Sequence, residues 1–373
     1  AIMISTFLYF NTKSIFGAVI TGLLLSGICS YNGIHCARTG DYDALLTLFT
    51  TATICSSYMY YSSKRILWIY LTGLSMTLAV LTKGVAGLLF LPSVIILLAL
   101  SWRQIKLHTT HLIIAIMLSV VGMITYYFLR GLADPNYLSA VWQNELGGRF
   151  GEAIEQHSGP ITFYLNHLWE NETLLVALLA IGSATLLSIK PKRNLFLIGY
   201  LFLVSIQFLT VISIAQTKLL WYLCPIYPII ALIIGACVSN IESSLKNNSK
   251  IIFTSLITLI VLQFNYSCFS TNQNYTLPEY AKKDYELSQF IKSRREKNTP
   301  IEECIYFNSY HPQIWVEIYI SIQDEFDICF KEPANIKSNE KIILFQEDVI
   351  NNHIDTTFSL EKKNGTLRFY VKK

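Results

Sequence analysis

Nine apolar segments of 17 to 21 residues, nearly free of charge, lie between residues 15 and 267. About 20 apolar residues in a helix cross the roughly 30 Å hydrocarbon core of a bilayer. We therefore expect nine full membrane spans. The segments are 15–34, 43–61, 66–82, 84–101, 111–129, 172–189, 195–215, 219–239 and 251–267. Residues 1–10 are apolar but too short to span, so we interpret them as the end of a partial span that begins before Ala1.

Charge is scarce and unevenly distributed. Only 14% of the residues are charged, against about 25% in a typical soluble domain, and most of them lie after residue 270. This excludes a single soluble globule, a disordered chain and a fibrous repeat. The net charge of +4 forms no continuous basic stripe, so nucleic acid is not an expected partner. The predicted fold is a polytopic α-helical membrane domain over 1–268, followed by a small periplasmic α/β domain over 270–373.

The C-terminal region mixes two periodicities. Residues 280–296 carry apolar side chains near helical spacing. Five short runs rich in Ile, Val, Phe and Tyr are typical of strands. These runs are 304–308, 313–321, 326–330, 341–346 and 366–373. No catalytic constellation appears in this region, so we expect an accessory domain.

Basic residues predict the orientation of the spans. Ten Lys and Arg residues fall in one set of alternate loops and five in the other. The positive-inside rule makes the richer set cytoplasmic. The long loop 130–171 and the C-terminal domain are then external, which in a bacterium places the protein in the inner membrane with that domain in the periplasm.

The cysteines form no metal-binding spacing. Four of them lie in apolar runs and are expected to pack as small hydrophobic side chains: Cys29, Cys55, Cys224 and Cys237. Cys304 and Cys329 are able to pair if the C-terminal domain faces an oxidising compartment.

Polar residues at membrane level are costly and commonly line cavities or bind charged ligands. Arg38, Asp41 and Asp43 lie together at an external turn, either as a helix cap or as a cluster facing a substrate cavity. Lys83 follows a predicted span directly, where it either extends to the interface or binds a lipid phosphate.

The external loop and the next external turn add further candidates. Arg149 is suited to a bidentate grip on phosphate, and His157 to a metal ion or a phosphate. Lys218 and Tyr222 lie at another external edge, where an aromatic belt is the simpler explanation for Tyr222. A last group at the entry to span 172–189 is interpreted as mostly interfacial: His167, Trp169, Glu170 and Glu172. Arg38, Lys83, Arg149 and Lys218 share the external side, and converging cations favour an anionic ligand.

Four blocks carry a family resemblance: ARTGDYDALLTLF, LTKGVAGLLFLP, NELGGRF with EQHSGPITFYL, and TKLLWYLCPIYP. In this order and spacing they resemble the GT-C glycosyltransferases, in the branch of the lipid A aminoarabinose transferase and the protein O-mannosyltransferases. The resemblance implies an inverting transferase that uses a polyprenyl (undecaprenyl) phosphate-linked sugar. The acceptor would be lipid A, a protein or a glycan at the periplasmic face.

The resemblance also implies roles for particular residues. The catalytic base is expected in a loop upstream of Ala1, with Asp41 and Asp43 as further candidates within the chain. Arg38, Lys83, Arg149, Lys218 and Tyr222 are expected to bind the donor phosphate. His157 matches a residue that binds a divalent metal, the one cofactor the resemblance raises.

Two other functions stay open at this point. A transporter or flippase of lipid-linked sugars would show internal repeats and ionisable residues near the midplane, and neither is evident. A non-catalytic scaffold would not depend on Lys83 or Arg149. An inactive fragment that lacks the N-terminal catalytic loop is the third possibility.

Overall fold

The computed structural model describes residues 1–33, 35–37, 41–142, 151, 157–188, 194–273, 279–306, 312–332, 335–345, 358–365 and 367–373. The chain divides into two compact units, Ala1–Gln273 and Asn274–Lys373.

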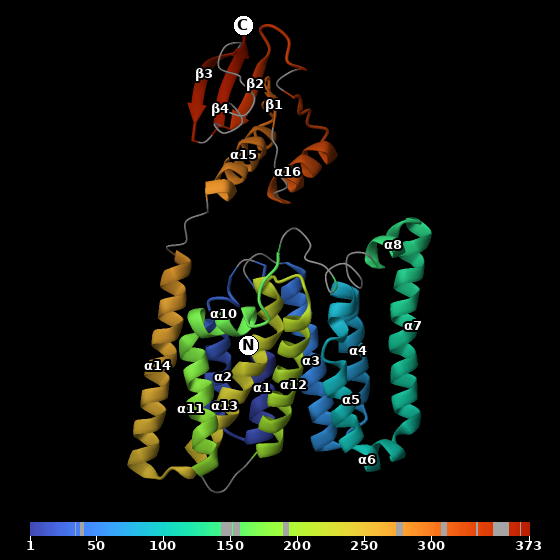
Figure 1. Ribbon diagram of the computed structural model, residues 1–373, viewed down its shortest axis with the longest axis vertical. Coiled ribbons are helices and arrows are strands. Elements are labelled where there is room, and N and C mark those ends of the chain that lie inside the picture. The colour runs from blue at the N-terminus through green and yellow to red at the C-terminus, as the bar shows by residue number, and fades with distance from the viewer. Residues whose placement is uncertain are drawn as a thin grey trace. The chain divides into compact units, whose positions relative to one another are not determined.

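Unit 1 is a helix bundle (Figure 1). Its first helices are α1 (Ile2–Thr12), α2 (Ile15–Gly27), α3 (Tyr42–Ser63), α4 (Leu67–Lys83), the 3₁₀ helix η1 (Gly84–Leu88) and α5 (Leu91–Leu100). Next come α6 (Trp102–Leu107), α7 (Thr109–Ala133), α8 (Tyr137–Val141), α10 (Phe163–Asn171) and α11 (Thr173–Ser188). The last are α12 (Leu195–Ile214), the 3₁₀ helix η4 (Leu220–Ile226), α13 (Tyr227–Ser244) and α14 (Asn247–Gln273).

Each predicted span overlaps a helix, but the bounds differ. In span 15–34 the helix ends at Gly27, and span 219–239 begins with η4 before α13. The predicted span 84–101 is not a single helix, because η1 turns back against α4 before α5 begins. Gly84 has φ +50°, which favours glycine. A Cβ at Gly87 would overlap the backbone of Ala79 and Val80. Within the described residues, five helical segments are long and apolar enough to cross a membrane: 67–88, 109–133, 195–214, 220–244 and 247–271.

Helix α13 is the centre of the bundle and is almost wholly buried. It packs against α2, α11, α12 and α1. The α2–α13 crossing is close because Gly17 and Gly235 face the partner helix, where an added Cβ would overlap Ser239 or Thr21. Small residues at such crossings are typical of membrane helices.

Helices α7 and α14 lie at the two edges of unit 1 (Figure 1) and expose most of their apolar side chains. A continuous exposed apolar surface of this kind is unusual in a soluble protein. It is the expected surface of a helix that faces lipid.

Unit 2 holds a four-stranded sheet in the order β1-β2-β4-β3. The elements are α15 (Glu279–Glu296), β1 (Cys304–Ile305), α16 (Pro312–Gln323), β2 (Lys341–Phe345), β3 (Phe358–Asn364) and β4 (Leu367–Lys372). β1 and β2 are parallel, and β4 is antiparallel to both β2 and β3. Ile343 packs with α15 and α16, while Ile342 and Leu344 pack in a separate cluster, as the two-residue period of a strand requires.

Two predictions for unit 2 are wrong. Residues 313–321 form most of helix α16 rather than a strand, because Pro312 opens a helix and Arg295 of α15 binds Glu317 and Asp324. The predicted strand 326–330 does not form. Only its last residue, Phe330, makes an isolated bridge, to Ile305. Strand β3 was not predicted, because its residues after Phe358 are exposed and, apart from Leu360, polar.

Candidate functional site

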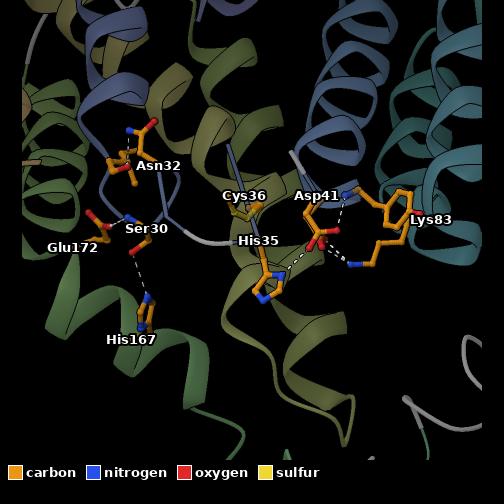
Figure 2. The surroundings of a disulfide bond; sticks show 12 residues. Ser30, Asn32, His35, Cys36, Asp41, Lys83, His167 and Glu172 are labelled. Atoms are coloured by element: carbon orange, nitrogen blue, oxygen red, sulfur yellow. Dashed lines mark hydrogen bonds and ion pairs between the residues drawn. A yellow bond between two sulfur atoms is a disulfide. The ribbon is translucent and has the colours of Figure 1, made fainter. Parts of the chain in front are cut away.

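The candidate site lies where four segments of unit 1 meet. These are the segment after α2, the start of α3, the end of α4 and η4. Two of the blocks that resemble known transferases supply α3 and α4, and a third supplies η4. Figure 2 shows the side chains that these segments bring together.

Asp43 and Lys83 form the central ion pair. The Lys83 Nζ donates to Asp43 Oδ1 at 2.7 Å and to Oδ2 at 2.6 Å, although 40 residues separate them in the sequence. The Asp43 side chain is 3% exposed and that of Lys83 is 28% exposed. The same Nζ lies 5.2 Å from the centroid of the Tyr222 ring. Lys83 therefore does not simply extend to the interface. Its ammonium is held between a buried carboxylate and an aromatic face.

Asp41 caps the start of α3 and binds His35. Its Oδ1 accepts from the backbone N–H of Tyr42 at 2.7 Å, and its Oδ2 lies 2.6 Å from His35 Nδ1 (Figure 2). Burial opposes the charged form of Asp41, but these two hydrogen bonds outweigh it and lower its pKa. Because a carboxylate only accepts, His35 Nδ1 donates this hydrogen bond. The ring lies 4.1 Å from that of Trp221.

A disulfide joins two of the site segments. It links Cys36, next to His35, with Cys224, two residues after Tyr222, across 188 residues of chain. Cys224 was predicted to pack as a free hydrophobic residue, and this is wrong. No sequence pattern indicates this pairing, because the two cysteines are far apart in the chain and only the fold brings them together.

A second polar cluster lies beside the site. Glu172 accepts from the backbone N–H of Ser30 at 3.1 Å, and Ser30 Oγ lies 3.4 Å from His167 Nε2 (Figure 2). Asn171 donates to His167 Nδ1, which leaves the proton on Nε2. Burial lowers the pKa of His167. Glu172 is 2% exposed and anchors the segment after α2. Its interfacial position in the membrane stays a prediction.

Lys218 occupies a different environment. Its Nζ donates to the backbone carbonyls of Ile212, Ser213 and Ala215 at the end of α12. Burial lowers the pKa of this ammonium, while the carbonyls and the negative end of the helix favour its charged form. The structure thus gives Lys218 a helix-capping role, and its predicted contact with phosphate is not needed to explain its position.

Three further predicted residues are Arg38, Arg149 and His157. Arg38 and Arg149 lie outside the described residues. His157 is exposed, and its carbonyl accepts from the Lys218 N–H at 2.8 Å. In the part of the chain that the structure describes, no three His, Cys, Asp or Glu side chains gather as metal ligands. The metal-binding role of His157 stays a prediction.

Sequence reasoning missed His35, the Cys36–Cys224 disulfide and the role of Ser30. His35 and Cys36 stand directly before the ARTGDYD block, so their closeness to Asp41 in the sequence was a usable signal. Ser30 carried no such signal, because its partners are more than 130 residues away.

Comparison of sequences supports the resemblance. A family model described as dolichyl-phosphate-mannose-protein mannosyltransferase matches residues 1–127. An undecaprenyl phosphate-alpha-4-amino-4-deoxy-L-arabinose arabinosyl transferase of Pectobacterium atrosepticum is 29% identical over 257 residues, covering 65% of this chain and 44% of the relative. The transferase of the same name from Pectobacterium carotovorum is 27% identical and covers 61% and 40%. The chain thus spans less than half the length of both curated relatives.

Comparison of structures supports the fold. ArnT from Cupriavidus metallidurans bound to undecaprenyl phosphate superposes with a TM-score of 0.66 at 12% identity, covering 99% of this chain and 81% of ArnT. Its apo structure gives 0.67 at 11% identity, with 98% and 81% covered. The predicted fold class and the resemblance to polyprenyl-phosphate glycosyltransferases are confirmed. With its long apolar helices, the chain is a multi-pass membrane protein.

Proposed function

We propose that the protein is an inverting membrane glycosyltransferase. It takes a sugar from a polyprenyl-phosphate carrier, which is undecaprenyl phosphate in the names of the relatives. It transfers the sugar to lipid A, or else to a protein or glycan. The observation that carries the proposal is the Lys83 ammonium, fixed by buried Asp43 beside Tyr222 in a fold shared with ArnT.

The ion pair suits Lys83 to hold a phosphate. A lysine ammonium has three donors, and Asp43 takes two of them. In this proposal the third donates to a phosphate oxygen of the donor. Preorganised charge of this kind stabilises a leaving group without reorganisation during the reaction. Asp43 then acts as a positioning residue for Lys83.

The reaction breaks the bond between the anomeric carbon and the phosphate oxygen. The electron pair of that bond leaves with the polyprenyl phosphate, where Lys83 neutralises the added charge. An acceptor oxygen attacks the anomeric carbon from the opposite face, so the configuration inverts. A hydroxyl acceptor must release a proton to a base, and the described chain offers Asp41, hydrogen-bonded to His35, beside the Asp43–Lys83 pair for this role. A phosphate acceptor needs no base.

The same proposal includes the location of the protein. We place it in the bacterial inner membrane with the candidate site and unit 2 on the periplasmic side. The excess of Lys and Arg in the other loops supports this orientation. The disulfides Cys36–Cys224 and Cys304–Cys329 support it too, because such bonds persist in oxidising compartments.

Transfer of a radiolabelled sugar tests the proposal. Membranes containing the full-length protein are given a labelled undecaprenyl-phosphate sugar and lipid A, and released undecaprenyl phosphate and labelled product are measured. We expect both in equal amounts. Lys83→Ala should raise the donor KM or abolish turnover, whereas Lys106→Ala, on helix α6, should not.

The same transfer experiment also distinguishes the transferase from a flippase and from a scaffold. A flippase would move the labelled donor across the bilayer without releasing undecaprenyl phosphate. A scaffold would show no turnover, and its function would survive Lys83→Ala. Failure of the full-length protein to cleave any polyprenyl-phosphate sugar would overturn the proposal.

A further inference from the structure

Two cysteine thiols meet where the segment after α2 packs against α14. Cys29 lies two residues after the end of α2 and is half-buried, whereas Cys268 is buried on α14. The two side chains are hydrogen-bonded to each other. Asn32, on the same segment as Cys29, donates from its Nδ2 to Cys268 Sγ at 3.9 Å. The proposed transfer reaction makes no use of this pair.

The packing of α2 on α14 holds the two thiols in register. Ser26 Oγ donates to Asn265 Oδ1 at 2.9 Å, and a Cβ at Gly27 would overlap α14, so the two helices approach closely here. Ser26 and Asn265 are 239 positions apart in the chain. Cys29 and Cys268 repeat that separation about one helical turn further along both segments. The contact between the thiols therefore follows from the same packing.

The segment that carries Cys29 also leads to the candidate site. It is fixed at Ser30, whose backbone N–H donates a hydrogen bond, and at Cys36, which forms the disulfide with Cys224 (Figure 2). A bond between Cys29 and Cys268 would fix this segment at a third point, to the last helix of unit 1.

Cys29 is also the most accessible thiol. The described cysteines outside the two disulfides are Cys29, Cys55, Cys237 and Cys268, and all of them except Cys29 are buried. An oxidant dissolved in water therefore reaches Cys29 first. Because Cys268 is already in contact with it, a short movement of the two sulfurs allows an S–S bond of about 2 Å.

We propose that Cys29 and Cys268 are a redox-active dithiol that closes into a third disulfide on reaction with a small-molecule disulfide. The Cys29 sulfur attacks the oxidant, breaks its S–S bond and releases one small thiol. The Cys268 sulfur then attacks the mixed disulfide on Cys29 and releases the second small thiol. The two cysteines give up two electrons to the oxidant, and their two protons leave on the released thiols. The structure shows the reduced state of the pair.

Oxidation of the purified full-length chain in detergent tests this proposal. The protein is incubated with oxidised glutathione at about pH 8, where thiolates form. Its remaining thiols are then blocked with N-ethylmaleimide in denaturant, and it is digested without a reductant. Mass spectrometry should show a peptide pair linked through Cys29 and Cys268, absent before oxidation and lost again with dithiothreitol. Oxidation should also remove two N-ethylmaleimide groups from the intact mass and raise the Tm, because the bond joins distant parts of the chain.

Three variants identify the reacting thiols. Cys29→Ser should abolish the linked peptide. Cys268→Ser should stop the reaction at a glutathione adduct on Cys29, because the second thiol is missing. The matched control Cys55→Ser removes a buried thiol on α3 and should form the link as wild type does.

Two results with the wild-type protein would contradict the dithiol. One is that Cys29 and Cys268 are both still blocked by N-ethylmaleimide after oxidation, or that Cys29 retains glutathione without forming the link. The other is a link from Cys29 to a different cysteine. The wild-type peptide map decides even if a variant does not fold. It also does not depend on sugar transfer, so failure of the proposed function would leave this result standing.

Discussion

The buried carboxylate of Asp43 determines how the site is held. An ionised group out of water is tolerated only when it is paired, and the pairing partner here is Lys83 at the end of another helix. Removing one member of a buried pair is costly because the other charge is left uncompensated. Replacing both with uncharged residues costs much less.

A double-mutant cycle on Asp43 and Lys83 follows from this asymmetry. Lys83→Met should lower the free energy of unfolding by about 3 kcal/mol or more. Asp43→Asn combined with Lys83→Met should recover a large part of that loss. Unfolding of the detergent-solubilised variants measures both effects. Fully additive single effects would show that the two side chains are not coupled.

The lowered pKa of Asp41 makes the stability of the folded protein depend on pH. Its pKa is lowered in the folded protein, so its contribution is present above the usual pKa of an aspartate and is lost as the pH falls through the folded value. Wild type should therefore be more stable than Asp41→Asn at pH 7, and the two should converge below about pH 4. Thermal unfolding between pH 3 and 8 measures this. A constant difference across that range would contradict the role of His35 and Tyr42 in stabilising the charged form.

At the level of elements, the end of α12 depends on Lys218. Its ammonium caps the last carbonyls of the helix. Lys218→Met should lower the Tm, because these carbonyls lose their charged donor. The donor KM of the folded variant should stay near that of wild type. A large rise in KM with an unchanged Tm would instead support the phosphate-binding role predicted from the sequence.

The α4–η1 turn sets the position of Lys83. Gly87→Ala should disrupt this turn, because the new Cβ would overlap the backbone of Ala79 and Val80. We expect a loss of stability of about 1–3 kcal/mol and weaker donor binding. Gly199→Ala is the matched control, because nothing lies within 4 Å of its added Cβ on α12. Equal effects of the two substitutions would contradict this packing argument.

At the level of the whole molecule, the two disulfides stabilise distant parts of the chain. Cys36–Cys224 closes a loop of 188 residues and Cys304–Cys329 one of 25. Removing a native disulfide typically costs about 2–5 kcal/mol. Intact mass after alkylation, with and without a reductant, should show two disulfides. Cys36→Ser should lower both the Tm and sugar transfer, while Cys55→Ser, a buried free cysteine, should leave the disulfide count unchanged. Alkylation of Cys36 without a reductant would contradict the first disulfide.

The sequence by itself determined the membrane class, the approximate position of the apolar helices and the choice of Asp41, Asp43, Lys83 and Tyr222 as candidates. Apolar length and the scarcity of charge are local properties, so they can be read without a structure. The same local rules failed for 313–321, where β-branched residues predicted a strand and packing against α15 produced a helix.

Only the tertiary structure decided which candidates act together. It paired Asp43 with Lys83 and joined Cys36 to Cys224. It also brought Glu172 into a hydrogen bond with the Ser30 N–H and directed the Lys218 ammonium to the carbonyls at the end of α12. Three of these contacts join residues 40 to 188 positions apart, and no pattern in the sequence encodes such a distance. Even where the partners are near in sequence, as for Lys218, burial among packed helices selects the partner, because only there is an unpaired charge too costly to leave.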